Sequence, residues 1–145
     1  MAEIVKATVA DIEEIADIEK RVFSDPWSEE VFISSVSYGT ELFAAKENGR
    51  VVGYIAVKTV ADEGSIDNIA VAPEYRRQGI GRALMGFADG YAEDEDLSVM
   101  FLEVRASNAA AISLYGSCGY ECYAVRKNYY SFPDEDALCL RKRMR

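Results

Sequence analysis

The sequence predicts a mixed α/β (α+β) fold, in which a central mixed sheet of about seven strands is flanked by about four helices. Two observations favour this class. Short segments with strand-like patterns and longer segments with helical spacing alternate along the chain, in the order β-α-α-β-β-β-α-β-α-β-β. No linker, repeat or low-complexity stretch interrupts them, so residues 1–145 are expected to form a single domain with helices on both faces of the sheet.

The first part of the chain is predicted to contain one strand and two helices. Residues 3–7 alternate in polarity, as in a half-buried strand. Thr8 and Asp11 resemble a capping box, so a helix is expected over 9–22. Its mostly apolar face has the helical spacing of Ile12, Ile15, Ala16 and Glu19. After a break in the pattern, Ser28 is expected to cap a second, short helix.

The middle of the chain is predicted to form three consecutive strands. Segments 41–47 and 50–60 flank Asn48-Gly49, a dipeptide that is typical of a type I′ hairpin turn. The segment Asp62-Glu63-Gly64 is predicted to turn the chain into a third strand, over about 65–72.

The second half of the chain is predicted to alternate helices with strands. One helix is expected from about Ile80, and another over 107–117 is expected to end before Gly119, a typical C′ residue. Between them, segment 97–104 is nearly all apolar, which predicts a central strand covered on both faces. Two further strands are expected near 120–128 and 136–143.

Composition and charge exclude several classes of function. The chain has 16 Lys and Arg against 25 Asp and Glu, a net charge of −9, which argues against direct nucleic acid binding and suits a basic partner. The lack of histidine removes Ser–His–Asp and Cys–His catalysis and most zinc sites, so no metal is expected. No membrane-spanning run or signal peptide is recognisable, and three cysteines without such a signal indicate reduced thiols in the cytoplasm.

A segment rich in glycine and arginine, between a predicted strand and a predicted helix, is the clearest local motif. It comprises Arg76, Arg77, Gln78, Gly79, Ile80, Gly81 and Arg82. Glycines let successive N–H groups converge, and a helix N-terminus adds positive partial charge, so the segment is predicted to bind a pyrophosphate. The alternative is an ordinary strand–helix turn with solvated arginines. The glycine spacing matches neither a P-loop nor a dinucleotide-binding fingerprint.

A carboxylate and a phenol are the candidate proton-transfer groups. Glu103 lies near the end of a strand that otherwise suits the core, and burial of an unpaired carboxylate favours its action as a general base at neutral pH. Tyr115 lies seven residues after Asn108 on the next predicted helix, so the two share one face, and the phenol can donate a proton to a leaving group. The alternatives are that Glu103 pairs with Arg105 or lies at a sheet edge, and that Tyr115 is a core residue.

These motifs resemble those of the GNAT superfamily of N-acetyltransferases. Arg76-x-x-Gly79-x-Gly81 is similar to the Arg/Gln-x-x-Gly-x-Gly/Ala motif of that superfamily, and the predicted order of strands and helices is that of its fold. Within the superfamily, the chain looks most like the RimI-type enzymes. The segments that carry this closer resemblance are 26–29, 68–71, 75–79, 102–115 and 126–130.

The resemblance implies transfer of an acetyl group from acetyl-CoA to a protein N-terminus. For RimI-type enzymes the acceptor is the N-terminal alanine of small-subunit ribosomal protein eighteen. By the same resemblance Glu103 is the proton acceptor and Tyr115 the proton donor. Gly116 and Cys118 depart from the pattern of the helix that carries Tyr115, and a glycine inside a helix lowers its local rigidity.

The resemblance also implies which residues bind acetyl-CoA. The backbone of Ile69, Ala70 and Val71 would pair with the pantetheine arm, and the glycine- and arginine-rich segment 76–82 would hold the pyrophosphate. Asn108 would contact the cofactor as well.

The acidic surface suits a basic protein N-terminus as acceptor, and by resemblance a ribosomal protein. Asp67 is a candidate to attract an ammonium group, and Trp27, Tyr129 and Tyr130 are candidates to form the walls of a peptide groove. The alternatives are a solvated strand residue and ordinary core aromatics. We expect a monomer or weak dimer.

Two other functions stay open from the sequence. The same fold can acetylate a small-molecule amine, or it can serve as a non-catalytic acyl-CoA-binding module. Turnover on an amine acceptor separates the enzyme from the binding module, and a screen of acceptors separates the two enzymes.

Overall fold

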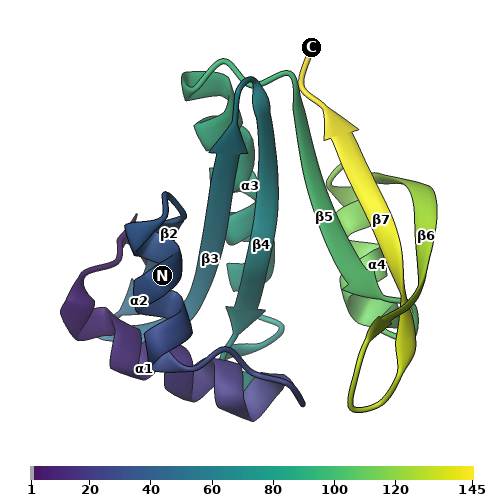
Figure 1. The fold of residues 1–145 in the computed structure, drawn as a ribbon. Coiled ribbons are helices and arrows are strands. Elements are labelled where there is room, and N and C mark those ends of the chain that lie inside the picture. The colour runs from purple at the N-terminus through teal and green to yellow at the C-terminus, as the bar shows by residue number, and fades with distance from the viewer. Residues whose placement is uncertain (1) are drawn as a thin grey trace.

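The computed structural model describes residues 2–145, and its seven strands lie in one sheet in the order β1-β2-β3-β4-β5-β7-β6 (Figure 1). The strands are β1 (Glu3–Lys6), β2 (Glu41–Glu47), β3 (Arg50–Val60), β4 (Glu63–Val71), β5 (Val99–Arg105), β6 (Glu121–Tyr130) and β7 (Glu135–Arg143). The helices are α1 (Val9–Val22), α2 (Glu29–Ser37), α3 (Ile80–Asp94), α4 (Ala109–Ser117) and a short 3-10 turn at Pro73–Tyr75. The predicted fold class and element order are confirmed.

The sheet is divided near its middle, between β4 and β5. These two strands form its parallel pair, and their register runs from Glu63 opposite Val99 to Ile66 opposite Leu102. Beyond that point β4 continues to pair with β3 and β5 continues to pair with β7, but β4 and β5 no longer pair with each other. Figure 1 shows the two strands separating toward their C-terminal ends. The sheet therefore opens where two parallel strands end together.

A β-bulge in β4 lies at the start of this opening. Ala56 of β3 is opposite Asn68, whereas the next residue, Val57, is opposite Ile66. Asp67 is therefore the extra residue of the bulge, with no partner residue on β3. A bulge of this kind bends its strand and redirects a side chain, and such bulges are common next to active sites.

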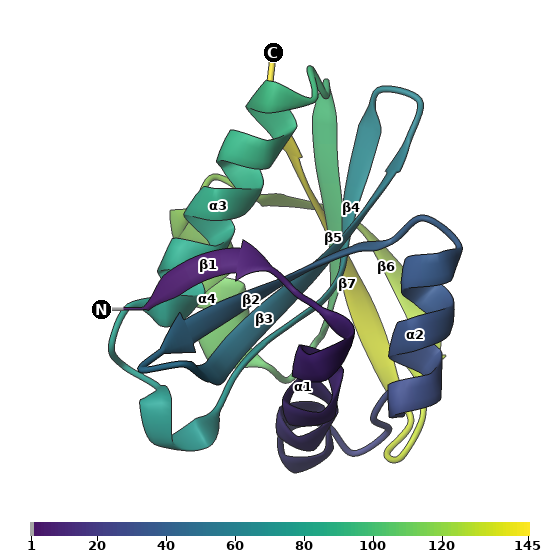
Figure 2. The same cartoon turned by 90° about the vertical axis from the view of Figure 1, so that its left-hand side faces the viewer.

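The helices cover the two halves of the sheet differently, as the turned view in Figure 2 helps to follow. On one face, α1 and α2 cover only the half formed by β2, β3 and β4, where they enclose a core of Ile12, Ile15, Ile18, Phe32, Leu42, Ala44 and Tyr54. On the opposite face, α3 and α4 cover a second core that extends across both halves and includes Val52, Ile55, Leu84, Met100, Leu102 and Leu140. On the same face of the sheet as α1 and α2, strands β5, β7 and β6 have no covering helix in residues 2–145.

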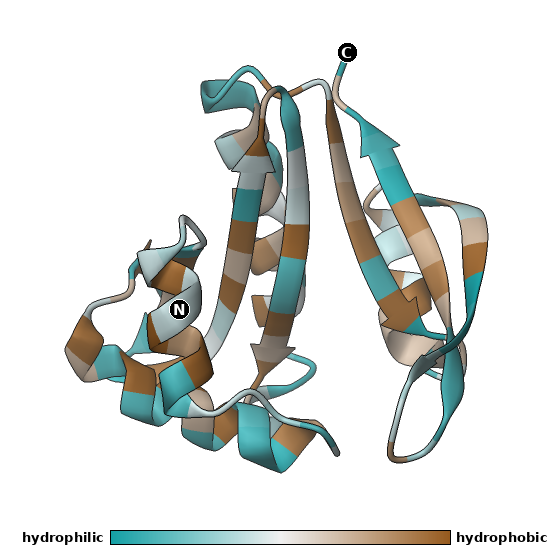
Figure 3. Cartoon of the chain, in the orientation of Figure 1, coloured by the Kyte–Doolittle hydropathy of each residue, from teal (hydrophilic) through white to brown (hydrophobic). Residues whose placement is uncertain are grey.

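Local signals in the N-terminal half of the chain are confirmed. Helix α1 has the predicted bounds, and the Thr8 N–H donates to the Asp11 carboxylate at 2.8 Å. The Ser28 Oγ accepts from the Val31 N–H at 3.2 Å at the start of α2. Polar and apolar residues alternate around α1, as expected for a helix with one buried side (Figure 3).

The Asn48-Gly49 turn is also confirmed. Both residues have positive φ, 53° and 78°, as a type I′ turn requires. The expected turn at Asp62-Glu63-Gly64 is misplaced, because the chain reverses at Ala61-Asp62 and β4 already begins at Glu63, two residues before the predicted strand. Gly64 is inside β4 for a packing reason, since a Cβ there would lie 2.8 Å from the Leu97 Cδ1 atom.

The prediction that the strand at 97–104 is covered on both faces is wrong. Met100, Leu102 and Val104 are buried on the face of α3 and α4, whereas Glu103 on the other face is exposed. The apolar run thus has a buried face and an open face. Strand β5 starts at Val99, and α4 starts at Ala109 with Asn108 as its N-cap.

Candidate active site

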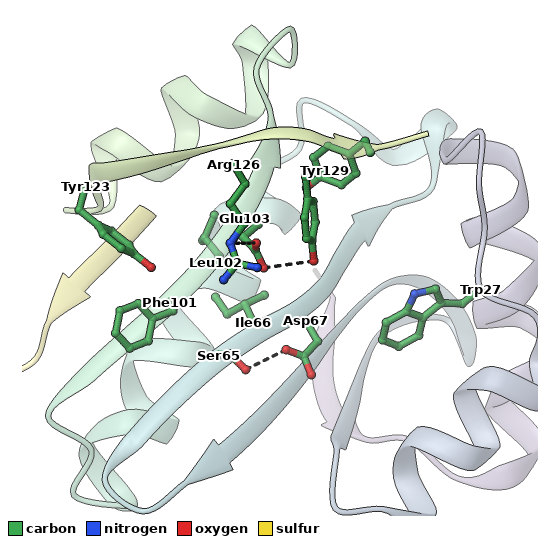
Figure 4. A pocket seen from close by; sticks show the side chains of 11 residues that line it. Trp27, Ser65, Ile66, Asp67, Phe101, Leu102, Glu103, Tyr123, Arg126 and Tyr129 are labelled. Carbon is green, nitrogen blue, oxygen red and sulfur yellow. Dashed lines mark hydrogen bonds and ion pairs between the residues drawn. The ribbon is translucent and has the colours of Figure 1, made fainter. Parts of the chain in front are cut away.

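A hollow of about 520 Å³ lies on the open face, at the point where β4 and β5 separate. Its volume is within the range of small-ligand sites, roughly 300–1,000 Å³. Figure 4 shows that β4, β5 and β6 contribute side chains on one side and Trp27 closes the other. The lining residues are Trp27, Ser65, Ile66, Asp67, Phe101, Leu102, Glu103, Tyr123, Arg126, Tyr129 and Tyr130.

Glu103 lies on the wall of this hollow with both carboxylate oxygens in contact with β6. The Arg126 Nε lies 3.3 Å from Oε2, and the Tyr129 hydroxyl donates to Oε1 at 3.4 Å (Figure 4). The Glu103 side chain keeps 33% of its surface exposed. The expectation of a buried, unpaired carboxylate is therefore wrong, because no helix covers this face of β5. Glu103 is instead an accessible carboxylate held by a guanidinium and a phenol.

The alternative partner, Arg105, does not pair with Glu103. Its guanidinium lies 3.2 Å from the Glu135 carboxylate and donates to the Ser131 carbonyl at 2.7 Å. It also lies over the Tyr130 ring, 4.6 Å from its centroid. Arg105 therefore ties the end of β5 to the connection between β6 and β7, which borders the hollow.

Tyr115 lies on the opposite face of the sheet from Glu103. Helix α4 places it in the core shared with Leu102 and Val104, where it is 7% exposed. Burial, and to a lesser degree the nearby Cys118 thiol, raise the pKa of Tyr115 to about 12. Its hydroxyl forms no hydrogen bond within residues 2–145. A molecule that reaches both Glu103 and Tyr115 must therefore lie across the opening between β4 and β5.

The glycine- and arginine-rich segment presents several unpaired backbone N–H groups at the start of α3. Arg77 and Gly79 have positive φ, 65° and 82°, and Gly79 is the N-cap of α3. From Arg77 through Arg82, no backbone N–H donates to any group in the part of the chain that the structure describes. Consecutive free N–H groups at a helix N-terminus are the donors that a pyrophosphate requires. These residues therefore fit a nucleotide-type cofactor.

Two other parts of the predicted cofactor site border the same opening. The residues Ile69, Ala70 and Val71 pair with β3 on one side and have no strand partner on the side of β5. Their backbone is thus available to an extended ligand. Asn108 is the N-cap of α4, where its Oδ1 accepts from the Ala111 N–H at 3.2 Å, so its side chain already has a local role. Gly81 lies close to α4, since a Cβ there would be 3.3 Å from the Leu114 Cδ2 atom.

All four residues proposed for acceptor binding line the hollow at the opening between β4 and β5, which we call the acceptor hollow. Asp67 accepts from the Ser65 hydroxyl at 2.8 Å, and Tyr129 and Tyr130 form an edge contact with centroids 5.0 Å apart. Trp27 packs on Phe32 at 5.2 Å and, with Asp67, also lines a second hollow beside α2. Burial, followed by the negative charge of Glu103, raises the pKa of Tyr129 and of Tyr130, so both stay neutral.

Sequence reasoning missed Arg126 and Tyr123, and it treated Glu19 only as part of a helix face. Strand β6 has register shifts between Cys122 and Ala124 and between Arg126 and Tyr130, so simple alternation does not reveal which of its residues face the hollow. Glu19 had a visible signal, because a carboxylate at an apolar position of an amphipathic helix needs buried partners.

Two features are absent from residues 2–145. None of the helices within residues 2–145 is long and apolar enough to cross a membrane. Over the same residues, no group of three or more Cys, Asp or Glu side chains is arranged to hold a metal ion.

Comparison with known proteins gives consistent matches over most of the chain. A model of the acetyltransferase (GNAT) family matches residues 12–120. The ribosomal protein bS18-alanine N-acetyltransferase of Escherichia coli K12 is 42% identical over 125 residues, which cover 85% of this chain and 84% of that protein. The protein of the same name from Salmonella typhimurium LT2 is 34% identical over 135 residues, or 92% and 91% of the two chains.

The fold agrees with that of a solved relative. The crystal structure of the ribosomal-protein-S18-alanine N-acetyltransferase from Escherichia coli superposes with a TM-score of 0.93 at 38% sequence identity. The superposition covers 99% of this chain and 94% of that one.

Proposed function

The chain belongs to the acetyltransferase (GNAT) family, and we propose that it acetylates the N-terminal α-amine of a protein, the N-terminal alanine of ribosomal protein bS18. The observation that carries the proposal is an accessible carboxylate, Glu103, in a hollow where β4 and β5 separate. The names of the relatives in Escherichia coli and Salmonella support the choice of acceptor. A ribosomal acceptor would place the reaction in the cytoplasm.

Acetyl-CoA is the cofactor that the family uses, and it supplies the acetyl group as a thioester. We assign the free N–H groups from Arg77 to Arg82 to its pyrophosphate, with the three arginines of segment 76–82 providing charge. The unpaired edge of β4 at 69–71 is assigned to the pantetheine arm, and Asn108 to a further contact. These groups line the opening from the start of α3 to the end of β4.

Glu103 is the proposed proton acceptor. The acceptor amine arrives as an ammonium and must lose a proton before it can attack a carbonyl carbon. Glu103 Oε2 takes that proton once the ammonium replaces Arg126 beside it. A backbone N–H near Val71 would stabilise the negative charge that develops on the thioester oxygen. Asp67, at the bulge, adds negative charge that attracts the ammonium.

Tyr115 is the proposed proton donor to the departing thiolate. Its raised pKa of about 12 keeps the hydroxyl protonated throughout the neutral range. Because no group in residues 2–145 accepts a hydrogen bond from it, the hydroxyl is available to a ligand in the opening. Proton acceptor and proton donor thus approach the reacting centre from opposite faces of the sheet.

The free energy of deprotonation at pH 7 favours an α-amine over a lysine side chain as the nucleophile. An α-amine has a pKa near ~7.8 and lysine near ~10.4, and each unit corresponds to about 1.36 kcal/mol. Deprotonation at pH 7 therefore requires about 1.1 kcal/mol for the α-amine and about 4.6 kcal/mol for lysine. A single accessible carboxylate is better matched to the first.

The test is release of CoA thiol from acetyl-CoA with two acceptor peptides. One begins Ala-Arg-Tyr-Phe with a free N-terminus, and the other has the same sequence with a blocked N-terminus and an added lysine. We expect turnover on the first alone, and a loss of about 100-fold or more in kcat for Glu103→Gln, the scale of a general base. Glu63→Gln, an exposed carboxylate on β4 outside the hollow, is the matched control and should behave as wild type. No turnover on either peptide would exclude the proposed acceptor.

A further inference from the structure

Glu19 is a buried carboxylate that the proposed chemistry does not use. It lies on α1, is 2% exposed, and accepts hydrogen bonds from three separate segments. Its Oε2 accepts from the Trp27 backbone N–H at 3.0 Å, and its Oε1 accepts from the Asn68 Nδ2 at 2.7 Å and from the Tyr54 hydroxyl. A carboxylate at this depth is stable only while its donors are in place.

Two of the three donors lie in segments that form opposite sides of the acceptor hollow. Trp27 lines both hollows from the connection between α1 and α2. Asn68 follows Asp67, the bulged residue that lines the same hollows, at the place where β4 leaves β5. Glu19 therefore joins the wall that carries Trp27 to the strand that carries Asp67. These contacts do not involve the α3 side, where the pyrophosphate is expected.

The third donor anchors the carboxylate itself. Tyr54 is fully buried on β3, and burial, with the adjacent negative charge of Glu19, raises the pKa of its hydroxyl. The hydroxyl thus remains a donor to Oε1. Tyr54 holds Glu19 against the sheet but touches neither hollow.

We propose that Glu19 is a positioning residue that sets the width of the acceptor hollow by holding Trp27 at a fixed place relative to β4. This inference rests on the proposed function. It assigns to Glu19 an effect on acceptor binding with little effect on acetyl-CoA binding. Its contribution is geometric, since it lies beneath the hollow and does not line it.

A glutamine at position 19 distinguishes positioning from proton transfer. Its Oε1 can accept from the Trp27 N–H, while its Nε2 donates to the Tyr54 oxygen and to an Asn68 amide turned over to present Oδ1. All three links survive, those to Tyr54 and Asn68 with reversed polarity, but the basic carboxylate is lost. Positioning therefore predicts that Glu19→Gln is active and that Glu19→Ala is impaired, whereas proton transfer predicts that both are impaired.

The experiment measures kcat and both KM values on the free-N-terminus peptide, together with fluorescence of Trp27, the one tryptophan of the chain. For Glu19→Ala we expect the KM for peptide to rise about tenfold or more, the KM for acetyl-CoA to stay within about twofold, and the Trp27 emission to shift to the red. For Glu19→Gln we expect all three within about twofold of wild type. Tyr54→Phe, which removes the anchor and keeps the Trp27 and Asn68 links, should lower the melting temperature, raise the KM for peptide less than Glu19→Ala does, and leave the KM for acetyl-CoA unchanged.

Asn68→Ala covers the case in which Glu19→Ala does not fold. It removes one link and leaves the Trp27 N–H held, so the KM for peptide should rise about threefold or more with unchanged Trp27 emission. An unchanged KM for peptide in Glu19→Ala, or in Asn68→Ala, would overturn the inference, as would a Glu19→Gln variant as impaired as Glu19→Ala. Absence of wild-type turnover would overturn the proposed function instead, and the Trp27 emission of Glu19→Ala and Glu19→Gln would then decide whether Glu19 holds the tryptophan.

Discussion

The two halves of the sheet differ in whether helices cover both of their faces or only one. Strands β2, β3 and β4 have α1 and α2 on one face and α3 on the other, so Ile15, Tyr54 and Ile55 are fully buried. Strands β5, β7 and β6 are covered on the face of α3 and α4 alone, and β6 is exposed along almost its whole length. We call the half formed by β2, β3 and β4 the closed half and the half formed by β5, β7 and β6 the open half. The opening between β4 and β5 is the border between them.

Because of this difference, the residues that stabilise the fold and the residues proposed to act in the reaction lie in different parts of the sheet. The closed half is covered on both faces and contains most of the fully buried large side chains, and Glu19, a buried carboxylate on α1, has three donors. The open half presents Glu103, Arg126 and Tyr129 to solvent, where an incoming acceptor can displace their mutual contacts. We expect substitutions in the closed half to change the free energy of unfolding, and substitutions at the border to change turnover.

The largest effect is expected for Tyr115→Phe, a border residue that reaches the reaction from the covered face. Loss of a general acid should lower kcat by about 100-fold or more, with an unchanged melting temperature because the hydroxyl has no partner in residues 2–145. Tyr120→Phe is the matched control. Its ring lies 6.5 Å from that of Tyr115, and its buried hydroxyl also lacks a partner among the described residues. Equal rates for the two variants would contradict the role of Tyr115.

The next effect sharpens the contrast in stability. Leu84 on α3 is 0% exposed against the closed half, and Leu84→Ala should lower the free energy of unfolding by about 2–5 kcal/mol. Val125 on β6 is 49% exposed, and Val125→Ala should change the free energy of unfolding by less than about 0.5 kcal/mol. Urea titration of both variants measures the difference. Similar losses in the two variants would mean that the open half is as tightly packed as the closed one.

A smaller effect is expected for Asp11→Ala at the start of α1. Burial alone would raise the pKa of Asp11, but bonds from Lys46 and from the Thr8 backbone and hydroxyl outweigh it and hold the pKa below its ordinary value. A depressed carboxyl pKa stabilises the fold above the unfolded pKa of about 3.9, and this contribution is lost as pH falls through the folded pKa. The variant should lose about 1–2 kcal/mol at pH 7, on the scale of a cap. The gap to wild type should shrink on acidification, and a gap that is constant with pH would exclude this linkage.

The smallest effect is expected for Arg126→Gln on the open half. Its ion pair with Glu103 is largely exposed, so the melting temperature should not change. The KM for peptide should fall about twofold, because the acceptor ammonium no longer has to replace a guanidinium. Lys127→Gln makes the same change of charge on the next residue, whose partner Asp136 lies outside the hollow, and should leave that KM unchanged. A higher KM in Arg126→Gln would mean that this arginine helps to bind the acceptor.

The closed half was also the more predictable from sequence. Caps, turns and helical spacing are local signals, and the Thr8–Asp11 box, Ser28 and the Asn48-Gly49 turn all lie where the sequence predicts them. The start of α3 was equally predictable, since the helix begins at Ile80 directly after Gly79, whose φ is positive. The one misplaced turn involved Gly64, whose glycine serves a close approach to Leu97 and not a reversal of the chain.

Burial and side-chain direction in the open half could not be predicted from local sequence signals. Burial of Glu103 depends on which helices cover β5, and that is decided by packing between segments far apart in the chain. The bulge at Asp67 and the register shifts in β6 also change the side on which residues emerge, so alternation alone does not place Arg126 beside Glu103. The roles assigned to Glu103 and Tyr115 remain predictions until their variants are measured.

The edges of the sheet have a consequence for how the protein behaves at high concentration. A strand with unpaired N–H and C=O groups is a template for pairing with another chain, and exposed edges favour aggregation. Here β1 is only four residues long, and β6 is interrupted by two register shifts, with Asn128 at a φ of 52°. The open half can therefore expose its working face without offering a straight strand on which a second sheet would grow.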